Sequence, residues 1–208
     1  MSQYFSIHPD NPQKRLINQA VEIIREGGVI VYPTDSCYAL GCHIGDKTAM
    51  TRISRIRQMD NTHNFTLVCR DLSEIGTYAK VGNTAFRTLK SATPGPYTFI
   101  LMATREVPRR LQNPKRKTIG LRVPDNIIAQ TLLEALGEPL MSTTLIMPGK
   151  TMPETEPEDI RDLLEKQVDL IIDGGHCGFE PTTMIDFTSD EPKLLREGKG
   201  RTDIFEID

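Results

Sequence analysis

The chain has 208 residues, of which 38% are hydrophobic and 25% charged, and its formal net charge is −3 at pH 7. These values are typical of an ordinary globular protein with a single core, and they do not demand a nucleic-acid partner. No apolar run approaches the roughly 20 residues needed to span a bilayer, and the polar start lacks the basic end and apolar core of a signal peptide. We therefore expect a cytoplasmic protein with no membrane partner.

The first half of the chain shows the alternation of helix and strand signals that predicts an α/β fold. A helix opens at Asn11-Pro12 and stops at Gly27-Gly28, and the nearly all-apolar strand 29–32 follows it. Apolar periodicity then predicts three more helices and two more strands. The helices are expected at 46–58, 72–79 and 83–91, and the strands at 65–69 and 97–103.

The second half continues the same alternation. Strands are expected at 118–123, 140–146 and 168–173, helices at 125–136 and 157–167, and a last strand in TTMIDFT. About seven strands and six helices predict one α/β domain over residues 1–208, with a twisted, mostly parallel or mixed sheet flanked by helices. The N-terminal arm and the closely spaced last strands favour a mixed sheet.

The cysteines form no recognisable framework. There is no CxxC pair among Cys37, Cys42, Cys69 and Cys177, so reduced thiols are expected. Cys37 lacks the local signature of a cysteine nucleophile, and a small buried thiol is the favoured interpretation. The dipeptides at 42–43 and 176–177 have the residue types of a zinc site, but adjacent side chains on a strand point to opposite faces. We expect no protein-bound metal.

Basic residues crowd one middle segment although the whole chain is slightly acidic. This segment favours a local basic surface, and RNA is a possible partner. The candidate RNA-binding residues are Arg109, Arg110, Lys115, Arg116 and Lys117. A solvated loop is the alternative, because the sequence has no stripe of aromatic residues and no recognition helix.

The segment YPTDSCY leaves a predicted buried strand through Pro33. Residues just beyond the carboxyl end of a strand in an open α/β sheet tend to face the ligand crevice. Thr34, Ser36 and Tyr38 offer neutral hydrogen-bonding groups suited to a small polar substrate, but an ordinary Asx or Ser turn explains the composition equally well. Arg122 and Arg196 each follow an apolar strand-like run, which would bring a guanidinium to such a crevice.

Several segments in order resemble the YrdC-type family from about Gly27 to Gly200. They are GGVIVYPTDSCYALG, GPYTFIL, TIGLRVPD, a strand ending at 142–144, PTTMID and LLREGKG. The resemblance implies a concave basic groove and an enzyme that joins L-threonine, bicarbonate and ATP into threonylcarbamoyl-AMP, a precursor of a modified adenosine in tRNA. Other members of the family have been regarded as binders of double-stranded RNA.

The resemblance also implies roles for individual residues. Thr34 and Arg122 would be catalytic and bind the substrate together with Tyr38 and Thr182. The nucleotide would be bound by Arg57, Ser142, Thr144 and Arg196. Magnesium would accompany ATP as part of the substrate, and no permanent cofactor is implied.

The chain departs from the family pattern at three places. The lysine-x-arginine pair becomes Arg57-Gln58-Met59, the serine-x-asparagine pair becomes Thr144-Leu145-Ile146, and a lysine-proline-leucine run becomes His63-Asn64-Phe65. Losing one positioned cation or donor costs on the order of 10²–10³ in rate. The sequence therefore predicts weak or altered synthase activity. The alternative is an RNA-binding or ribosome-maturation module without turnover.

Overall fold

The computed structural model describes residues 1–59, 64–189 and 191–205 of the chain. His63, the first residue of one of the altered motifs, lies outside these residues. The strands are β1 (Gln3–Ser6), β2 (Ile30–Tyr32), β3 (Ala39–His43), β4 (Thr66–Val68), β5 (Ala79–Lys80), β6 (Tyr97–Ala103), β7 (Thr118–Arg122), β8 (Leu140–Thr144), β9 (Leu170–Asp173), β10 (Thr183–Asp186) and β11 (Lys193–Arg196). The helices are α1 (Lys14–Arg25), α2 (Lys47–Arg57), α3 (Leu72–Tyr78), α4 (Asn83–Ala92), α5 (Ile127–Leu136) and α6 (Pro157–Leu164). Short 3-10 helices lie at η1 (Arg109–Leu111) and η2 (Asp203–Phe205).

All strands belong to one mixed sheet in the order β1-β9-β2-β3-β8-β4-β7-β6-β10-β11, with β5 paired to β6. The pairs β1–β9, β2–β9, β4–β7 and β6–β10 are parallel, and the other pairs are antiparallel. The α/β fold, the mixed sheet and the six predicted helices are confirmed within the described ranges. In the part of the chain that the structure describes, the sheet has 11 strands, where the sequence predicts about seven.

The four additional strands carry weak sequence signals. β1 and β11 are edge strands, β5 has only two residues, and β3 contains Gly41, a residue that weakens a strand pattern. Burial of β3 between β2 and β8 leaves no room for a larger residue, since a Cβ at Gly41 would lie 2.9 Å from the Tyr32 ring. Tertiary packing, and not local propensity, therefore makes β3 a strand.

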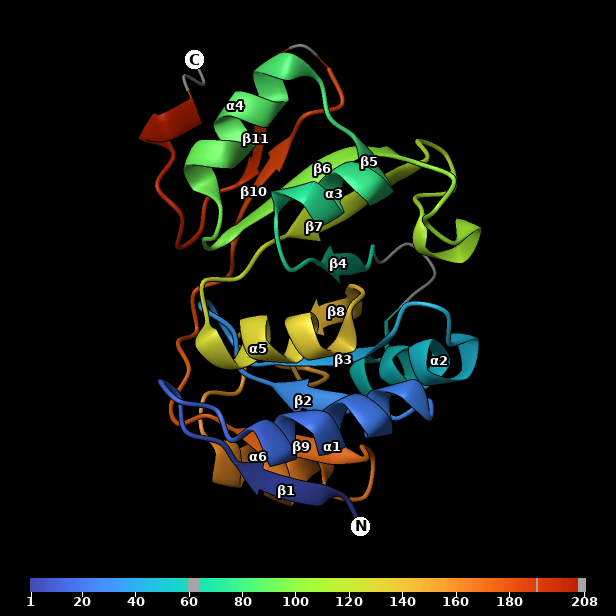
Figure 1. The fold of residues 1–208 in the computed structure, drawn as a ribbon, viewed down its shortest axis with the longest axis vertical. Coiled ribbons are helices and arrows are strands. Elements are labelled where there is room, and N and C mark those ends of the chain that lie inside the picture. The colour runs from blue at the N-terminus through green and yellow to red at the C-terminus, as the bar shows by residue number, and fades with distance from the viewer. Residues whose placement is uncertain (60–63, 190, 206–208) are drawn as a thin grey trace.

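Helices cover the sheet along its whole length. Figure 1 shows α1 and α5 over the half that begins at β1, and α3 and α4 over the half that ends at β11. Apolar residues of α1 and α5 pack on β2 and β9, whereas α2, α3, α4 and α6 contribute to a second buried cluster. Within the described residues, no helix is long and apolar enough to cross a membrane.

Local capping fixes where α2 begins and ends. The side chain of Asp46 accepts a hydrogen bond from the backbone N–H of Ala49 at 2.8 Å, which caps the start of the helix. Gln58 ends it in the left-handed conformation with φ of 50°. This geometry places Arg57 beside β8, where it donates to the carbonyl of Thr144.

Candidate active site

Two adjoining cavities open over the central strands. The smaller, here called the polar pocket, has a volume of about 140 Å³. It is lined by Ser36, Cys37, Ala39, Arg57, Asn64, Thr66, Val68, Thr98, Arg122, Ser142, Thr143, Thr144, Ile146, Thr182, Met184 and Arg196. The larger, here called the groove, has a volume of about 620 Å³ and is lined by Arg57, Gln58, Met59, Asn64, Phe65, Thr66, Ile100, Leu111, Asn113, Arg116, Thr118, Ile119, Gly120, Met184 and Leu195.

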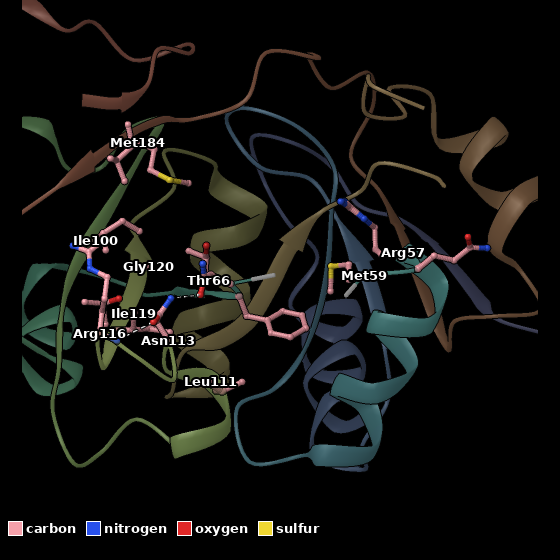
Figure 2. Close-up of a pocket in the computed structure, with 15 residues that line it drawn as sticks. Arg57, Met59, Thr66, Ile100, Leu111, Asn113, Arg116, Ile119, Gly120 and Met184 are labelled. Carbon is pink, nitrogen blue, oxygen red and sulfur yellow. Dashed lines mark hydrogen bonds between the residues drawn. The ribbon is translucent and has the colours of Figure 1, made fainter. Parts of the chain in front are cut away.

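Four of the described residues line both cavities, and we call them the junction: Arg57, Asn64, Thr66 and Met184. Figure 2 shows the groove between Arg57 and Met59 on one side and Asn113, Arg116 and Gly120 on the other. Of the residues described, no Asp or Glu lines either cavity. The two cavities together therefore favour an anionic ligand that has a small polar group for the polar pocket and a larger group for the groove.

Arg122 is held at the wall of the polar pocket by the turn that follows β2. Its Nη1 donates to the Ser36 hydroxyl at 3.2 Å, and its Nη2 donates to the Asp35 carboxylate. Asp35 also accepts from the backbone N–H of Asp125 at 2.9 Å. The Nε of Arg122 is buried and has no hydrogen-bond acceptor among the described atoms. This nitrogen is closed to solvent, so Arg122 acts on a ligand in the pocket through the charge of its guanidinium group.

Arg57 enters the pocket from the end of α2. Its Nη1 donates to the backbone carbonyl of Thr144 on β8. The Nε of Arg57 is the second buried nitrogen without an acceptor in the part of the chain that the structure describes. Burial lowers the pKa of this guanidinium, but an arginine remains charged at neutral pH. Two guanidinium groups thus bring positive charge to one small cavity.

Arg196, at the end of β11, supplies a third cation. Its Nε and Nη2 donate to the carbonyl of Thr182 at 3.0 and 2.8 Å, and Nη2 also donates to the Thr182 hydroxyl at 3.0 Å. The hydroxyls of Thr182 and Thr98 lie 2.7 Å apart. Lys199 donates to the backbone carbonyl of Asp35, so the C-terminal segment joins the turn after β2.

Thr34 and Tyr38 are not among the described residues that line the two cavities. The Thr34 hydroxyl donates to the carbonyl of Cys37 at 2.7 Å and accepts from the backbone N–H of Ser36 at 3.1 Å, which is the bonding of a Thr turn. The proton of the Thr34 hydroxyl is used in the bond to Cys37. The Ser36 hydroxyl therefore donates to the Thr34 hydroxyl oxygen at 3.1 Å, and the Ser36 oxygen accepts from Arg122. Tyr38 donates to the carbonyl of Gly175 at 2.6 Å.

Ser142 and Thr144 reach the polar pocket from β8. The Ser142 hydroxyl donates to the carbonyl of Leu40 at 3.0 Å, so Tyr32 is the donor in the 2.7 Å bond between the two side chains. Burial raises the pKa of Tyr32 to about 12, which keeps this proton in place. Ile146 lines the same pocket and Met59 lines the groove, and each presents only an apolar surface there.

Cys37 also lines the polar pocket, but its chemistry is that of a buried thiol. Burial raises the pKa of the Cys37 thiol, although the charge of Arg122 opposes the shift. Its Sγ lies 3.2 Å from the carbonyl of Glu180. No group of three His, Cys, Asp or Glu side chains able to hold a metal ion is found within the described ranges.

The five basic residues singled out from the sequence do not share one environment. Arg110 donates to the backbone carbonyls of Ile44 and Gly45. Arg116 lines the groove and donates to the Asp186 carboxylate at 2.6 Å. Arg109 and Lys117 line a separate cavity, here called the basic cavity, and Lys115 is exposed. The basic cavity has a volume of about 930 Å³ and its described lining contains Lys80, Arg105, Arg109 and Lys117 but no acidic residue.

Sequence reasoning missed Thr98 and Lys199 at the site, and it did not pair Asp35 with Arg122. A signal existed for Asp35, because a buried arginine requires a carboxylate partner and Asp35 directly follows Thr34 in the YPTD segment. Thr98 and Lys199 reach the site only through the pairing of β6 with β10 and the course of the chain after β11. Local patterns carry no information on such contacts.

The fold and the site define an α/β protein whose mixed sheet carries an arginine-lined pocket and groove. The family model of Sua5, YciO and YrdC proteins, described as telomere recombination, matches residues 22–198. The chain belongs to this family, and the resemblance of the motifs is confirmed.

Close relatives support the same assignment. The chain is 68% identical to YciO of Escherichia coli K12 over 200 residues, which are 96% of this chain and 97% of that protein. The crystal structure of E. coli YciO matches with a TM-score of 0.95 and 67% identity, covering 99% of this chain and 100% of that one.

Two more distant proteins carry functional names. The threonylcarbamoyl-AMP synthase of Vibrio vulnificus YJ016 is 29% identical over 187 residues, 88% of this chain and 98% of that protein. Pyrococcus abyssi Sua5 complexed with L-threonine matches with a TM-score of 0.87 and 26% identity, over 95% of this chain and 58% of that one.

Proposed function

We propose that the protein binds ATP together with a small amino acid, L-threonine, and forms a carbamoyl adenylate of the threonylcarbamoyl-AMP kind, either slowly or with altered substrate choice. The observation that carries the proposal is the meeting of three arginines, Arg57, Arg122 and Arg196, at one small pocket whose described lining has no carboxylate. Fixed cations in a cavity without carboxylates favour an anionic ligand. The names of the synthase and Sua5 relatives support the choice of substrates.

The chemistry requires positive charge at this place. The threonine amine and bicarbonate first give a carbamate and water. A carbamate oxygen then attacks the α-phosphorus of ATP, the P–O bond to the β-phosphate breaks, and pyrophosphate leaves with its electron pair. Negative charge accumulates on the phosphoryl oxygens, and fixed cations stabilise it without reorganisation.

The residues have distinct roles in this proposal. Arg122 binds the carboxylate or carbamate, with Ser36 and Thr182 as hydroxyl partners. Arg57 and Arg196 face the phosphates, and Thr34 acts through its bond to Ser36 by keeping that hydroxyl aimed at Arg122. Magnesium enters with the triphosphate, since the described lining of both cavities offers it no carboxylate.

A calorimetric titration tests the proposal directly. ATP with magnesium is titrated into the protein with and without L-threonine, and release of pyrophosphate from labelled ATP is followed with bicarbonate present. Tighter ATP binding in the presence of threonine is expected, together with a slow release that Arg122→Ala abolishes. The matched control is Arg161→Ala, which alters an arginine stacked on the Tyr4 ring at the other end of the sheet. Absence of both binding and release would end the proposal.

RNA binding is a second candidate function, and the basic cavity is the observation that favours it. Among the described residues, none of its four cations forms an ion pair, and the described lining has no acid to neutralise them. Phosphate groups bound in this way are held more weakly as the salt concentration rises. The same surface is equally suited to a short polyanion, so inorganic tripolyphosphate is the comparison for duplex RNA.

The RNA test measures binding of a labelled duplex RNA by fluorescence anisotropy at two salt concentrations, with tripolyphosphate as a competitor. Replacing Arg105, Arg109 and Lys117 with alanine should weaken binding uniformly across RNA sequences. The slope of log K against log salt should fall by about 1 for each phosphate that the variant no longer binds. Replacing the exposed Lys14 and Lys166 is the matched control. Equal binding by both variants would exclude this surface as the RNA site.

A further inference from the structure

Asn64 occupies the place where the two cavities meet. It lines both the polar pocket and the groove, and it follows the end of α2 in the chain. The other junction residues are Arg57, Thr66 and Met184, so Asn64 is the one amide of the four. A ligand that extends from the polar pocket into the groove must pass this side chain.

The orientation of Asn64 is set by a second amide, that of Asn113. The Oδ1 of Asn113 accepts from the backbone N–H groups of Lys115 and Arg116 at 3.1 and 2.9 Å. These two bonds identify the oxygen of the Asn113 side-chain amide, because an amide oxygen accepts hydrogen bonds and an amide nitrogen does not. Its Nδ2 is thereby turned outward and donates to the Oδ1 of Asn64 at 3.3 Å.

The loop that carries Asn113 is itself closed by backbone bonds. Lys117 N–H donates to the carbonyl of Asn113 at 2.8 Å, and Asn113 N–H donates to the carbonyl of Thr118 at 2.8 Å. Since the Oδ1 of Asn64 faces this rigid loop, its Nδ2 must face away from it. Because Asn64 lines both cavities, its Nδ2 N–H groups are the side-chain donors that it can offer to a ligand there.

We propose that Asn64 Nδ2 hydrogen-bonds the phosphoryl group through which the amino-acid and nucleotide halves of the adenylate are joined, and that Asn113 is the positioning residue that aims it. This inference rests on the proposed function. Arg57 is the cation among the junction residues, and Asn64 is their amide donor. Ile146, which lines the polar pocket, offers only hydrocarbon to the same ligand.

The test is the affinity for ATP at saturating L-threonine, measured by calorimetry on the full chain. Asn64→Ala should weaken binding by about tenfold or more, the effect of losing a hydrogen bond to a charged group. Asn64→Asp should weaken it further, because a carboxylate would face the phosphate. Asn64 is exposed, so both variants should keep the wild-type unfolding midpoint.

Asn113→Asp separates positioning from direct contact. An aspartate retains the acceptor for the Lys115 and Arg116 N–H groups but draws the Asn64 amine toward itself, so it should weaken ATP binding about as much as Asn64→Ala. The double variant should then be no weaker than either single one. The matched control is Gln112→Ala, since the neighbouring Gln112 amide donates to the carbonyl of Val107, in the direction of the basic cavity.

The outcomes distinguish this inference from the proposed function. Wild-type protein that binds neither ATP nor threonine would overturn both. Wild-type protein that binds both ligands, with Asn64→Ala and Asn64→Asp within twofold of it, would overturn the role of Asn64 alone. Additive losses of affinity in the Asn64 and Asn113 variants would overturn the positioning by Asn113.

Discussion

Arg122 and Asp35 form an ion pair in which each side chain is only 9% exposed. The pair joins the end of β7 to the turn that follows β2, two segments 87 residues apart in the chain. Burying two charges is costly unless each charge is paired, and here the Asp35 carboxylate also accepts from the Asp125 N–H. The pair therefore fixes the direction of Arg122 at the polar pocket.

Removing the carboxylate should destabilise the fold. Asp35→Ala leaves Arg122 buried without its anion, and the free energy of unfolding should fall by on the order of 3 kcal/mol in urea denaturation. Lys150→Ala is the comparison, because it removes an ion pair whose lysine side chain is 53% exposed and should cost less than about 1 kcal/mol. Equal effects of the two substitutions would contradict a structural role for the buried pair.

Much of the fold follows from sequence patterns because the helices carry their own signals. The amphipathic run of α1 and the Asp46 cap of α2 are local features, and all six helices were predictable from signals of this kind. β3 and β11 were not, since β3 contains Gly41 and β11 has four exposed residues. Their pairing depends on segments distant in sequence.

The site was predictable only in part for a similar reason. The resemblance of the motifs singled out Arg57, Arg122 and Arg196, and these residues do line one pocket. Residue types alone left two interpretations of Thr34, a ligand contact or a turn, and its hydroxyl is used within the turn. Sequence patterns do not reveal which hydroxyl protons the fold already uses.

Restoring polar groups at Met59 and Ile146 should raise synthase activity, because the family pattern has an arginine and an asparagine at these two positions. Met59 lines the groove and Ile146 the polar pocket, so an arginine and an asparagine at these places would add a cation and a donor near the ligand. The double variant Met59→Arg, Ile146→Asn should release pyrophosphate from ATP about ten to a hundred times faster than the wild type. This gain is smaller than the factor of roughly 10²–10³ in rate that one well-positioned donor can supply.

The control for this gain is Met102→Arg, which adds the same charge at the basic cavity. It should leave the rate of pyrophosphate release unchanged. A double variant no faster than the wild type would show that these two positions do not limit the reaction.

Asp186 gives the stability of the protein a predictable dependence on pH. Burial raises the pKa of this carboxyl, but hydrogen bonds from Thr188 and Arg116 outweigh burial and hold the pKa below its ordinary value of 3.8. Because the folded pKa is the lower one, the carboxylate stabilises the fold above about pH 4, and this contribution disappears as the pH falls through the folded pKa.

The corresponding measurement compares Asp186→Asn with the wild type in urea at a series of pH values. The variant should be less stable at pH 7, and the difference should shrink below pH 3.8. Asp10→Asn, on an exposed loop, should match the wild type throughout. A gap between Asp186→Asn and the wild type that is independent of pH would contradict the ionised pair with Arg116.

The four cysteines should be inert in the folded protein. All of them are buried, and burial raises the pKa of Cys42 to about 12 and that of Cys177 to about 11. Thiol reagents attack the thiolate, so at pH 8 the native protein should react many times more slowly than the protein in guanidinium, where all four thiols titrate. Cys37 lines the polar pocket and should be the first to react, with ATP and L-threonine slowing it further. Fast modification of Cys37 in the native protein would instead indicate an activated thiol, and Cys37→Ser would identify it.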